Sequence, residues 1–111
     1  MGIQNLAQDI VFVTLSREPQ TGQELRGIND IVADEGGCDV VIDFCMVEIF
    51  SSASLNSLLI LRRLQHEQRR QLILCNMAVP TKCIFTVAGL DTCFEFVSDK
   101  SAAIAALQHS G

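Results

Sequence analysis

The chain contains few of the residues that mark several protein classes. It has only 2 prolines and 7 glycines in 111 residues, which excludes a collagen-like or linker-like chain. Charged residues make up 19% and hydrophobic residues 49%, a balance that excludes intrinsic disorder. At this length the composition predicts a single domain over residues 1–111.

Long apolar segments are also missing. The leucine-rich stretch 55–64 is interrupted by polar residues, so no segment has the roughly 18 apolar residues that a membrane-spanning helix needs. The N-terminal residues lack the basic and apolar regions of a secretory signal, and Leu6 stands where myristoylation requires serine or threonine. We therefore expect a cytoplasmic protein without membrane insertion.

Basic residues are scarce. The chain has 8 basic and 13 acidic residues, giving a net charge of -5. Domains that bind nucleic acid are usually basic, so we expect no nucleic-acid partner.

The patterns that mark metal sites and catalytic sites are absent from the sequence. No CxxC pair occurs, and His66 and His109 lie in polar contexts, so we expect no metal site. There is no glycine-rich phosphate loop and no GxSxG motif. Asp43 falls near the end of a predicted strand, where α/β sheets bind ligands, but no histidine is placed beside it. We therefore expect no cofactor, no catalytic residue and no enzyme.

The five cysteines are expected to be reduced and unlinked: Cys38, Cys45, Cys75, Cys83 and Cys93.

The apolar pattern predicts strands that alternate with helices. Strands are expected at 9–15, 38–44, 71–75 and 94–97, and helices at 21–34, 51–69, 80–88 and 100–107. Thr21 and Glu24 have the spacing of a capping box for the first helix. Ile84, Phe85, Val87 and Ala88 give the third helix an apolar side. The uninterrupted apolar runs in the second and third strands predict burial on both faces, and the alternation predicts an α/β fold with a largely parallel sheet.

The helix after Ser51 has apolar residues on nearly all sides in its first half. A helical projection places Ile60, Leu61 and Leu64 with Ala53 and Ser57 on the side expected to face the sheet. Leu58 falls at the boundary. Either both sides are buried, or the second side is an exposed apolar strip that marks a partner site. That second side holds Ser52, Leu55, Asn56, Leu59, Arg62, Arg63 and His66.

Two further features of this helix also have two explanations. Ser51 and Ser52 are typical helix caps, but a phosphate on Ser52 would also meet free backbone amides and the positive end of the helix dipole. That phosphate would add about -1.5 to -2 charge beside Leu55 and repel an apolar partner. The arginines at 62, 63, 69 and 70 either form a solvated face and helix end, or Arg62 and Arg63 steer an acidic partner.

Residues 39–107 resemble a STAS domain, the domain of the bacterial anti-sigma factor antagonists. The resemblance covers about two thirds of the chain and depends on the order of its segments. It implies a mixed, mostly parallel central sheet of four or five strands flanked by about four helices. The segments are DVVIDF at 39–44, VEIFSSASLNSLLILRRL at 47–64, QLILCN at 71–76 and VAGLDTCFEFVSDKSAAIAAL at 87–107.

The resemblance implies a binding module in partner switching. The unmodified domain would bind an anti-sigma factor with serine-kinase activity and free a sigma factor; phosphorylation of a serine would end this binding, and a serine phosphatase would restore it. Aligning Leu55 with the motif leucine places Ser52 on the phosphorylated serine, and Ser51 stands where the family has aspartate. Ala53 falls on the motif's second serine and Ser54 on its glycine. The implied partner-binding residues are Ser51, Ser52, Leu55, Asn56, Leu59, Arg62 and Arg63.

A second function is left open by the same resemblance. Some STAS domains are non-phosphorylated subunits of lipid-transport or stress-signalling complexes. The missing aspartate at position 51 favours this alternative.

Overall fold

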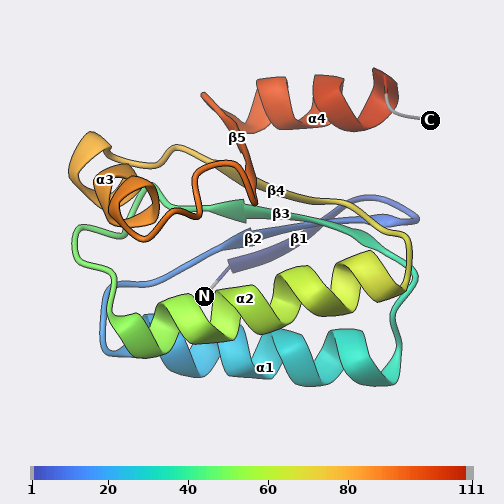
Figure 1. Cartoon of the computed structure of the whole chain (residues 1–111). Coiled ribbons are helices and arrows are strands. Elements are labelled where there is room, and N and C mark those ends of the chain that lie inside the picture. The colour runs from blue at the N-terminus through green and yellow to red at the C-terminus, as the bar shows by residue number, and fades with distance from the viewer. Residues whose placement is uncertain (1, 110–111) are drawn as a thin grey trace.

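A five-stranded sheet in the order β1-β2-β3-β4-β5 lies at the centre of the molecule (Figure 1). The structure is a computed structural model that describes residues 2–109 and the side chains of residues 2–108. Strand β1 (Gly2–Ala7) runs antiparallel to β2 (Ile10–Thr14). The remaining strands are all parallel to β2: β3 (Asp39–Asp43), β4 (Leu72–Cys75) and β5 (Glu95–Val97). The predicted mixed, mostly parallel α/β sheet is confirmed.

The helices cover both faces of the sheet. Helices α1 (Gln20–Asp34) and α2 (Ser52–Glu67) lie side by side on one face, and α4 (Lys100–His109) covers the other (Figure 1). Helix α3 (Val79–Val87) lies at the end of the sheet where the parallel strands finish. The N-termini of α1 and α2 open towards this same end, because each follows a parallel strand.

Alternate residues of the central strands supply two separate cores. Val40 and Ile42 face α1 and α2, whereas Val41 packs with Ala103 and Leu107 of α4. All three β3 residues are at most 2% exposed. This explains why the apolar run has no polar residue at alternate positions, and it confirms the prediction of burial on both faces.

Strand β1 was not expected from the sequence. Its residues GIQNLA are exposed except for the half-buried Leu6, so the strand lacks the apolar residues that predicted the other four. As an edge strand it is held mainly by backbone hydrogen bonds to β2, which composition does not reveal.

The predicted capping box at the start of α1 is wrong. The helix begins at Gln20, directly after Pro19, and no side-chain hydrogen bond caps it. Thr21 therefore lies inside the first turn, where its hydroxyl donates to the carbonyl of Ser16 at 2.6 Å. Glu24 does reach back, but it accepts from the amide of Ser16 at 2.7 Å.

Candidate functional site

The start of α2 holds three serines, of which Ser51 and Ser52 are exposed and Ser54 is buried. Ser51 is the N-cap, with φ -77° and ψ 160°, and its Oγ accepts a hydrogen bond from the amide of Ser54 at 3.1 Å. The predicted capping role is thereby confirmed for Ser51. Ser52 is the first helical residue and is exposed. Ser54 is fully buried, so the three hydroxyl groups have different surroundings within one turn of helix.

A carboxylate from another part of the chain completes this cluster. Glu18, in the loop between β2 and α1, accepts hydrogen bonds on Oε2 from the Ser51 amide at 2.8 Å and from the Ser54 hydroxyl at 2.7 Å. The Ser51 hydroxyl in turn donates to Ser54 Oγ at 3.0 Å. Burial raises the pKa of Glu18, but hydrogen bonds from Ser51, Ser54 and the Gly22 backbone outweigh it, so the pKa is lowered overall. Glu18 therefore holds a negative charge at the N-terminal ends of α1 and α2, where both helix dipoles favour it.

Sequence reasoning missed Glu18. Glu18 lies 33 residues before Ser51 in the chain. No local sequence pattern indicates that it contacts the start of α2. The family aspartate is absent at position 51, yet the structure places a carboxylate next to the same helix terminus.

The Ser52 hydroxyl is the unengaged one of the three. Within the described residues no hydrogen bond involves its side chain, whereas the Ser51 and Ser54 hydroxyls both donate and accept. Ser52 is therefore an exposed serine at the end of a helix that favours negative charge.

The surface of α2 beyond Ser52 is partly apolar. Leu55 and Leu59 are half-buried and pack against the main core, while Asn56 is exposed. Leu59 and Asn56 also line a shallow hollow together with Ile60 and Arg63. This side of α2 is therefore neither fully buried nor a fully exposed apolar strip. Leu55 and Leu59 contribute to the core and remain partly accessible to solvent.

The predicted sheet-facing side of α2 is wrong in part. Ile60 is 43% exposed and Ala53 is exposed, whereas Leu58, placed at the boundary, is fully buried. The buried stripe includes Ser54 and Ser57, because α2 packs on α1 as well as on the sheet, and short serine side chains allow the two helices to approach closely. Asn29 of α1 donates to the Ser57 carbonyl at 2.9 Å across this contact. A hydrophobic projection cannot mark such polar positions as buried.

Solved structures with the same arrangement of elements include anti-sigma factor antagonists. RsbS from Moorella thermoacetica, in a serine-to-glutamate variant, matches with a TM-score of 0.81 at 16% identity over 97% of this chain and 94% of that chain. SpoIIAA of Bacillus in its unphosphorylated form matches with 0.79 at 14% identity over 97% and 96%. A STAS domain protein from Planctomyces limnophilus, also an anti-sigma factor antagonist, matches with 0.78 at 20% identity over 96% and 97%.

The chain has the STAS fold. The sequence itself matches no protein-family model and no curated protein. The likeness therefore lies in the structure, and it extends over almost the full length of each neighbour. In this chain it includes β1 and α1, which come before the segments that resemble the family in sequence.

The two arginines near the end of α2, Arg62 and Arg63, make different contacts within the chain. Arg62 donates from Nε to the Cys93 carbonyl at 2.6 Å, which ties α2 to the loop before β5. Arg63 is exposed and lies 3.7 Å from Glu67 one turn later. Both arginines are exposed, but each has a contact within the chain: Arg62 with the Cys93 carbonyl and Arg63 with Glu67.

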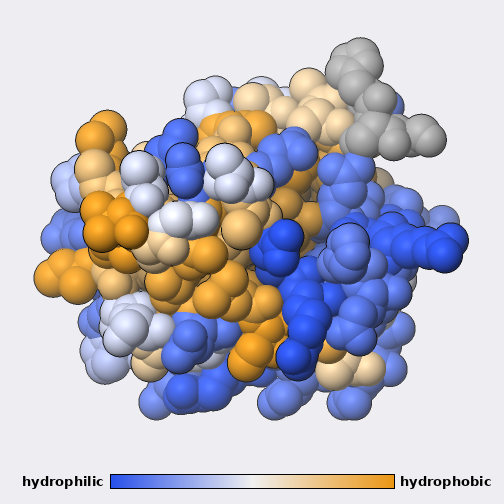
Figure 2. All heavy atoms as spheres, viewed as in Figure 1, coloured by the Kyte–Doolittle hydropathy of each residue, from blue (hydrophilic) through white to orange (hydrophobic). Residues whose placement is uncertain are grey.

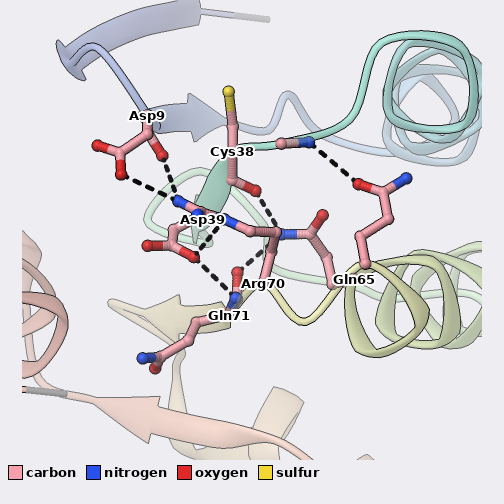
Figure 3. A network of polar contacts seen from close by, with 8 residues as sticks. Asp9, Cys38, Asp39, Gln65, Arg70 and Gln71 are labelled. Atoms are coloured by element: carbon pink, nitrogen blue, oxygen red, sulfur yellow. Dashed lines mark hydrogen bonds and ion pairs between the residues drawn. The ribbon is translucent and has the colours of Figure 1, made fainter. Parts of the chain in front are cut away.

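Arg70 belongs to a polar network at the other end of the sheet (Figure 3). Its guanidinium lies 3.1 Å from Asp9 Oδ2 and 3.1 Å from Asp39 Oδ1. It therefore joins the turn before β2, the start of β3 and the chain leading into β4, a structural role far from Ser52.

A second exposed apolar surface was not anticipated. Figure 2 shows hydrophobic residues gathered over α3 and the adjoining part of α2. Of the predicted apolar side of α3, only Phe85 is buried; Val87 is 88% exposed, and Ile84 and Ala88 are exposed. Val79 at the start of α3 and Ile49 in the loop before α2 are 76% and 74% exposed. Phe85 packs in an aromatic cluster and Thr81 is also buried, whereas Val79, Ile84 and Val87 of this helix are exposed.

Asp43 has partners that give it a structural role. Its Oδ1 accepts from the Cys45 amide at 2.9 Å and from Asn76 Nδ2 at 3.0 Å, which joins the ends of β3 and β4. Burial and then the charge of Asp43 raise the pKa of Cys75 to about 12, so this neighbouring thiol is not a nucleophile at neutral pH.

Residues 2–109 contain no group of three side chains that could hold a metal ion. No helix in the same range is long and apolar enough to cross a membrane.

Proposed function

We propose that this chain is an anti-sigma factor antagonist that works by protein–protein binding and is controlled by phosphorylation of Ser52. The observation that carries the proposal is the exposed, unengaged Ser52 hydroxyl at the N-terminus of α2 in a chain with the STAS fold. SpoIIAA, which has this fold, is described in both unphosphorylated and phosphorylated forms. The single domain would act in the cytoplasm without catalysis of its own.

The binding surface would be the side of α2 that follows Ser52. Leu55 and Leu59 supply apolar contacts, Asn56 and Arg63 supply polar ones, and Ser51 lies at the edge. Arg62 contributes its exposed part while its Nε remains bound to Cys93. The partners would be an anti-sigma factor with serine-kinase activity and a serine phosphatase.

Phosphorylation would act at this surface by charge. A phosphoryl group on Ser52 brings about -1.5 to -2 charge next to Leu55 and close to the carboxylate of Glu18. An apolar or acidic partner surface that fits the unmodified protein would then be repelled, while the fold would be preserved because Ser52 is outside the core.

The decisive experiment is calorimetric titration of the co-purified partner with wild type, Ser52→Ala and Ser52→Asp. We expect wild type and Ser52→Ala to bind and Ser52→Asp to lose binding. Ser51→Ala serves as the matched control and should keep the switch, with a small loss of stability from the missing cap. Equal binding by all variants would show that Ser52 is not the switch.

A role as a subunit of a larger signalling assembly is the second candidate. One neighbour with this fold, at 17% identity and a TM-score of 0.75, is a component of the stressosome. Serine in place of aspartate at position 51 favours this candidate. Recovery of the native protein in a large, unphosphorylated assembly would support it over partner switching.

A further inference from the structure

Glu18 joins two segments that are far apart in the chain. It lies in the loop 15–19 between β2 and α1, and its Oε2 accepts from the Ser51 amide at 2.8 Å and from the Ser54 hydroxyl at 2.7 Å. We call these two contacts the Glu18 clasp. Glu18 is half-buried and Ser51 is exposed, so the clasp lies at the surface, apart from the apolar contacts that hold α1 and α2 on the sheet.

The outer part of this loop has little else to hold it against the start of α2. Within residues 2–108, residues 17–19 make one further polar contact with the segment that leads into α2, an ion pair of Arg17 with Glu48 at 3.7 Å. Both side chains of that pair are well exposed, and such pairs contribute little. The position of residues 17–19 therefore depends mainly on Glu18.

The Glu18 carboxylate is held by uncharged donors and by helix dipoles. Its pKa lies below the ordinary value of 4.5, so the group is charged at neutral pH. Its donors in the clasp are an amide and a hydroxyl, and no lysine or arginine among residues 2–108 forms an ion pair with it. The positive charge that favours it is the roughly +0.5 at the N-terminus of each neighbouring helix.

A phosphoryl group on Ser52 would reverse this balance of charge. Ser52 directly follows Ser51, which places the phosphate within roughly one Debye length, about 8–10 Å, of the carboxylate. The phosphate brings about -1.5 to -2 charge, which exceeds the roughly +0.5 of each helix end. Its oxygens are also strong acceptors for the amides at the start of the helix. Glu18 would thus be repelled and would compete with a stronger acceptor.

We propose that phosphorylation of Ser52 opens the Glu18 clasp, so that Glu18 leaves the start of α2 and residues 17–19 become mobile. This inference rests on the proposed phosphorylation of Ser52. Phosphorylation then alters two segments of the surface, α2 and the loop before α1, while the core beneath them is kept. A partner that acts on the modified form, such as a serine phosphatase, meets a changed loop as well as a phosphate.

The test uses protein in which phosphoserine is incorporated at position 52 during synthesis, so that no kinase is needed. In backbone ¹⁵N relaxation, the order parameters of the Arg17 and Glu18 amides should fall from about 0.85, typical of a rigid backbone, to below about 0.6. The Ser51 amide signal should shift, because its acceptor changes. Phosphoserine at position 101 is the matched control: Ser101 is an exposed serine on α4, and modification there should leave these signals unchanged.

Two substitutions separate the charge of Glu18 from its contacts. Glu18→Ala removes the clasp, so the amides of residues 17 and 18 should be mobile without any phosphate. Glu18→Gln keeps an acceptor oxygen but has no charge to be repelled, so phosphorylation at position 52 should leave the loop rigid. If phosphorylated Glu18→Gln becomes as mobile as phosphorylated wild type, repulsion of Glu18 is not the cause and the proposal is wrong.

The result separates the clasp from the switch. Order parameters that phosphorylation leaves unchanged, or that are already low in the unmodified protein, would overturn clasp opening. Calorimetric titration of the co-purified partner with the same phosphorylated protein tests the proposed function independently. Lost binding with a rigid loop would keep the switch at Ser52 and reject the clasp, and retained binding with a mobile loop would do the reverse. The amide signals of β3 should persist in every sample, and their loss would mean global unfolding and would also overturn the proposal.

Discussion

At its N-terminal end α2 is held by short serine side chains and one carboxylate, whereas at its C-terminal end long glutamine side chains tie it to α1 and β3. Gln68 donates to the Val32 carbonyl at 2.9 Å and accepts from the Gly37 amide at 3.2 Å. The buried side chain of Gln65 donates to the carbonyls of Cys38 and Gln71 in the same region. The amides of Gln65 and Gln68 therefore both bridge elements, and we expect the loss of either to weaken the fold.

The N-terminal end is different because the Ser52 hydroxyl makes no hydrogen bond to any described residue. Ser51 and Ser54 are used with Glu18, while Ser52 is left exposed. One end of α2 thus carries side chains that bridge to other elements, and the other end carries the serine at which we propose phosphorylation. A phosphate at Ser52 changes the surface without breaking a contact that supports the core.

The largest expected effect is a loss of stability at the C-terminal end of α2. Gln65→Ala should lower the free energy of unfolding by about 2–4 kcal/mol, because a buried side chain is lost and the part-buried carbonyls of Cys38 and Gln71 lose their donor. Urea denaturation monitored by circular dichroism measures the change. Gln23→Ala, at an exposed glutamine on α1, is the control and should stay within about 0.5 kcal/mol of wild type. Equal stability of the two variants would contradict the anchoring role of Gln65.

A charge in the middle of the helix should separate fold from binding. Leu59→Asp should cost about 1–2 kcal/mol of stability, because Leu59 is only half-buried, and should weaken binding of the co-purified partner at least tenfold. Denaturation and calorimetric titration give the two quantities. Ala105→Asp, at an exposed position on α4 on the opposite face of the sheet, should change neither quantity appreciably. If Leu59→Asp unfolds the protein, Leu59 belongs to the core and the binding surface must be sought elsewhere.

The carboxylate at the modifiable end should have a smaller effect that depends on pH. Glu18→Gln should lower stability at pH 7 by about 1 kcal/mol, a value reduced by partial exposure of the group. Because the folded pKa of Glu18 is below its ordinary value of 4.5, its stabilisation is complete above that value and is lost as pH falls through the folded pKa.

Denaturation curves of wild type and Glu18→Gln should therefore converge in acid. Glu48→Gln is the matched control, since Glu48 is 76% exposed and its contact with Arg17 at 3.7 Å contributes little. A stability difference between wild type and Glu18→Gln that does not change with pH would show that the Glu18 charge is not what stabilises this end.

The smallest expected effect concerns the stability of the switch variants. Ser52→Asp should be more stable than Ser52→Ala by about 0.3–1 kcal/mol, because a negative group at the first helical position interacts with the helix dipole. The nearby charge of Glu18 places the gain at the lower end of this range. Thermal melts in low salt measure the difference, and about 1 M NaCl should remove it by screening. A large destabilisation of Ser52→Asp would mean that loss of binding reflects unfolding.

Local sequence was a good guide where one element carries its own signal. The four parallel strands and the four helices follow from apolar runs, helix periods and caps, and Ser51 caps α2 as its position predicts. Periodicity failed where a residue's neighbour comes from another element. Strand β1 exists because β2 offers its edge, and Ser54 and Ser57 are buried because α1 presses against them.

By itself the sequence determined the α/β alternation, the two-sided burial of β3 and β4 and the cap at Ser51, because apolar periodicity and capping act over a few residues. Tertiary structure decided which side of α2 faces the core, that Glu18 supplies the carboxylate beside Ser51, and that Gln65 bridges the carbonyls of Cys38 and Gln71. Those outcomes depend on distances between residues some 6 to 33 positions apart, which only the packed chain sets.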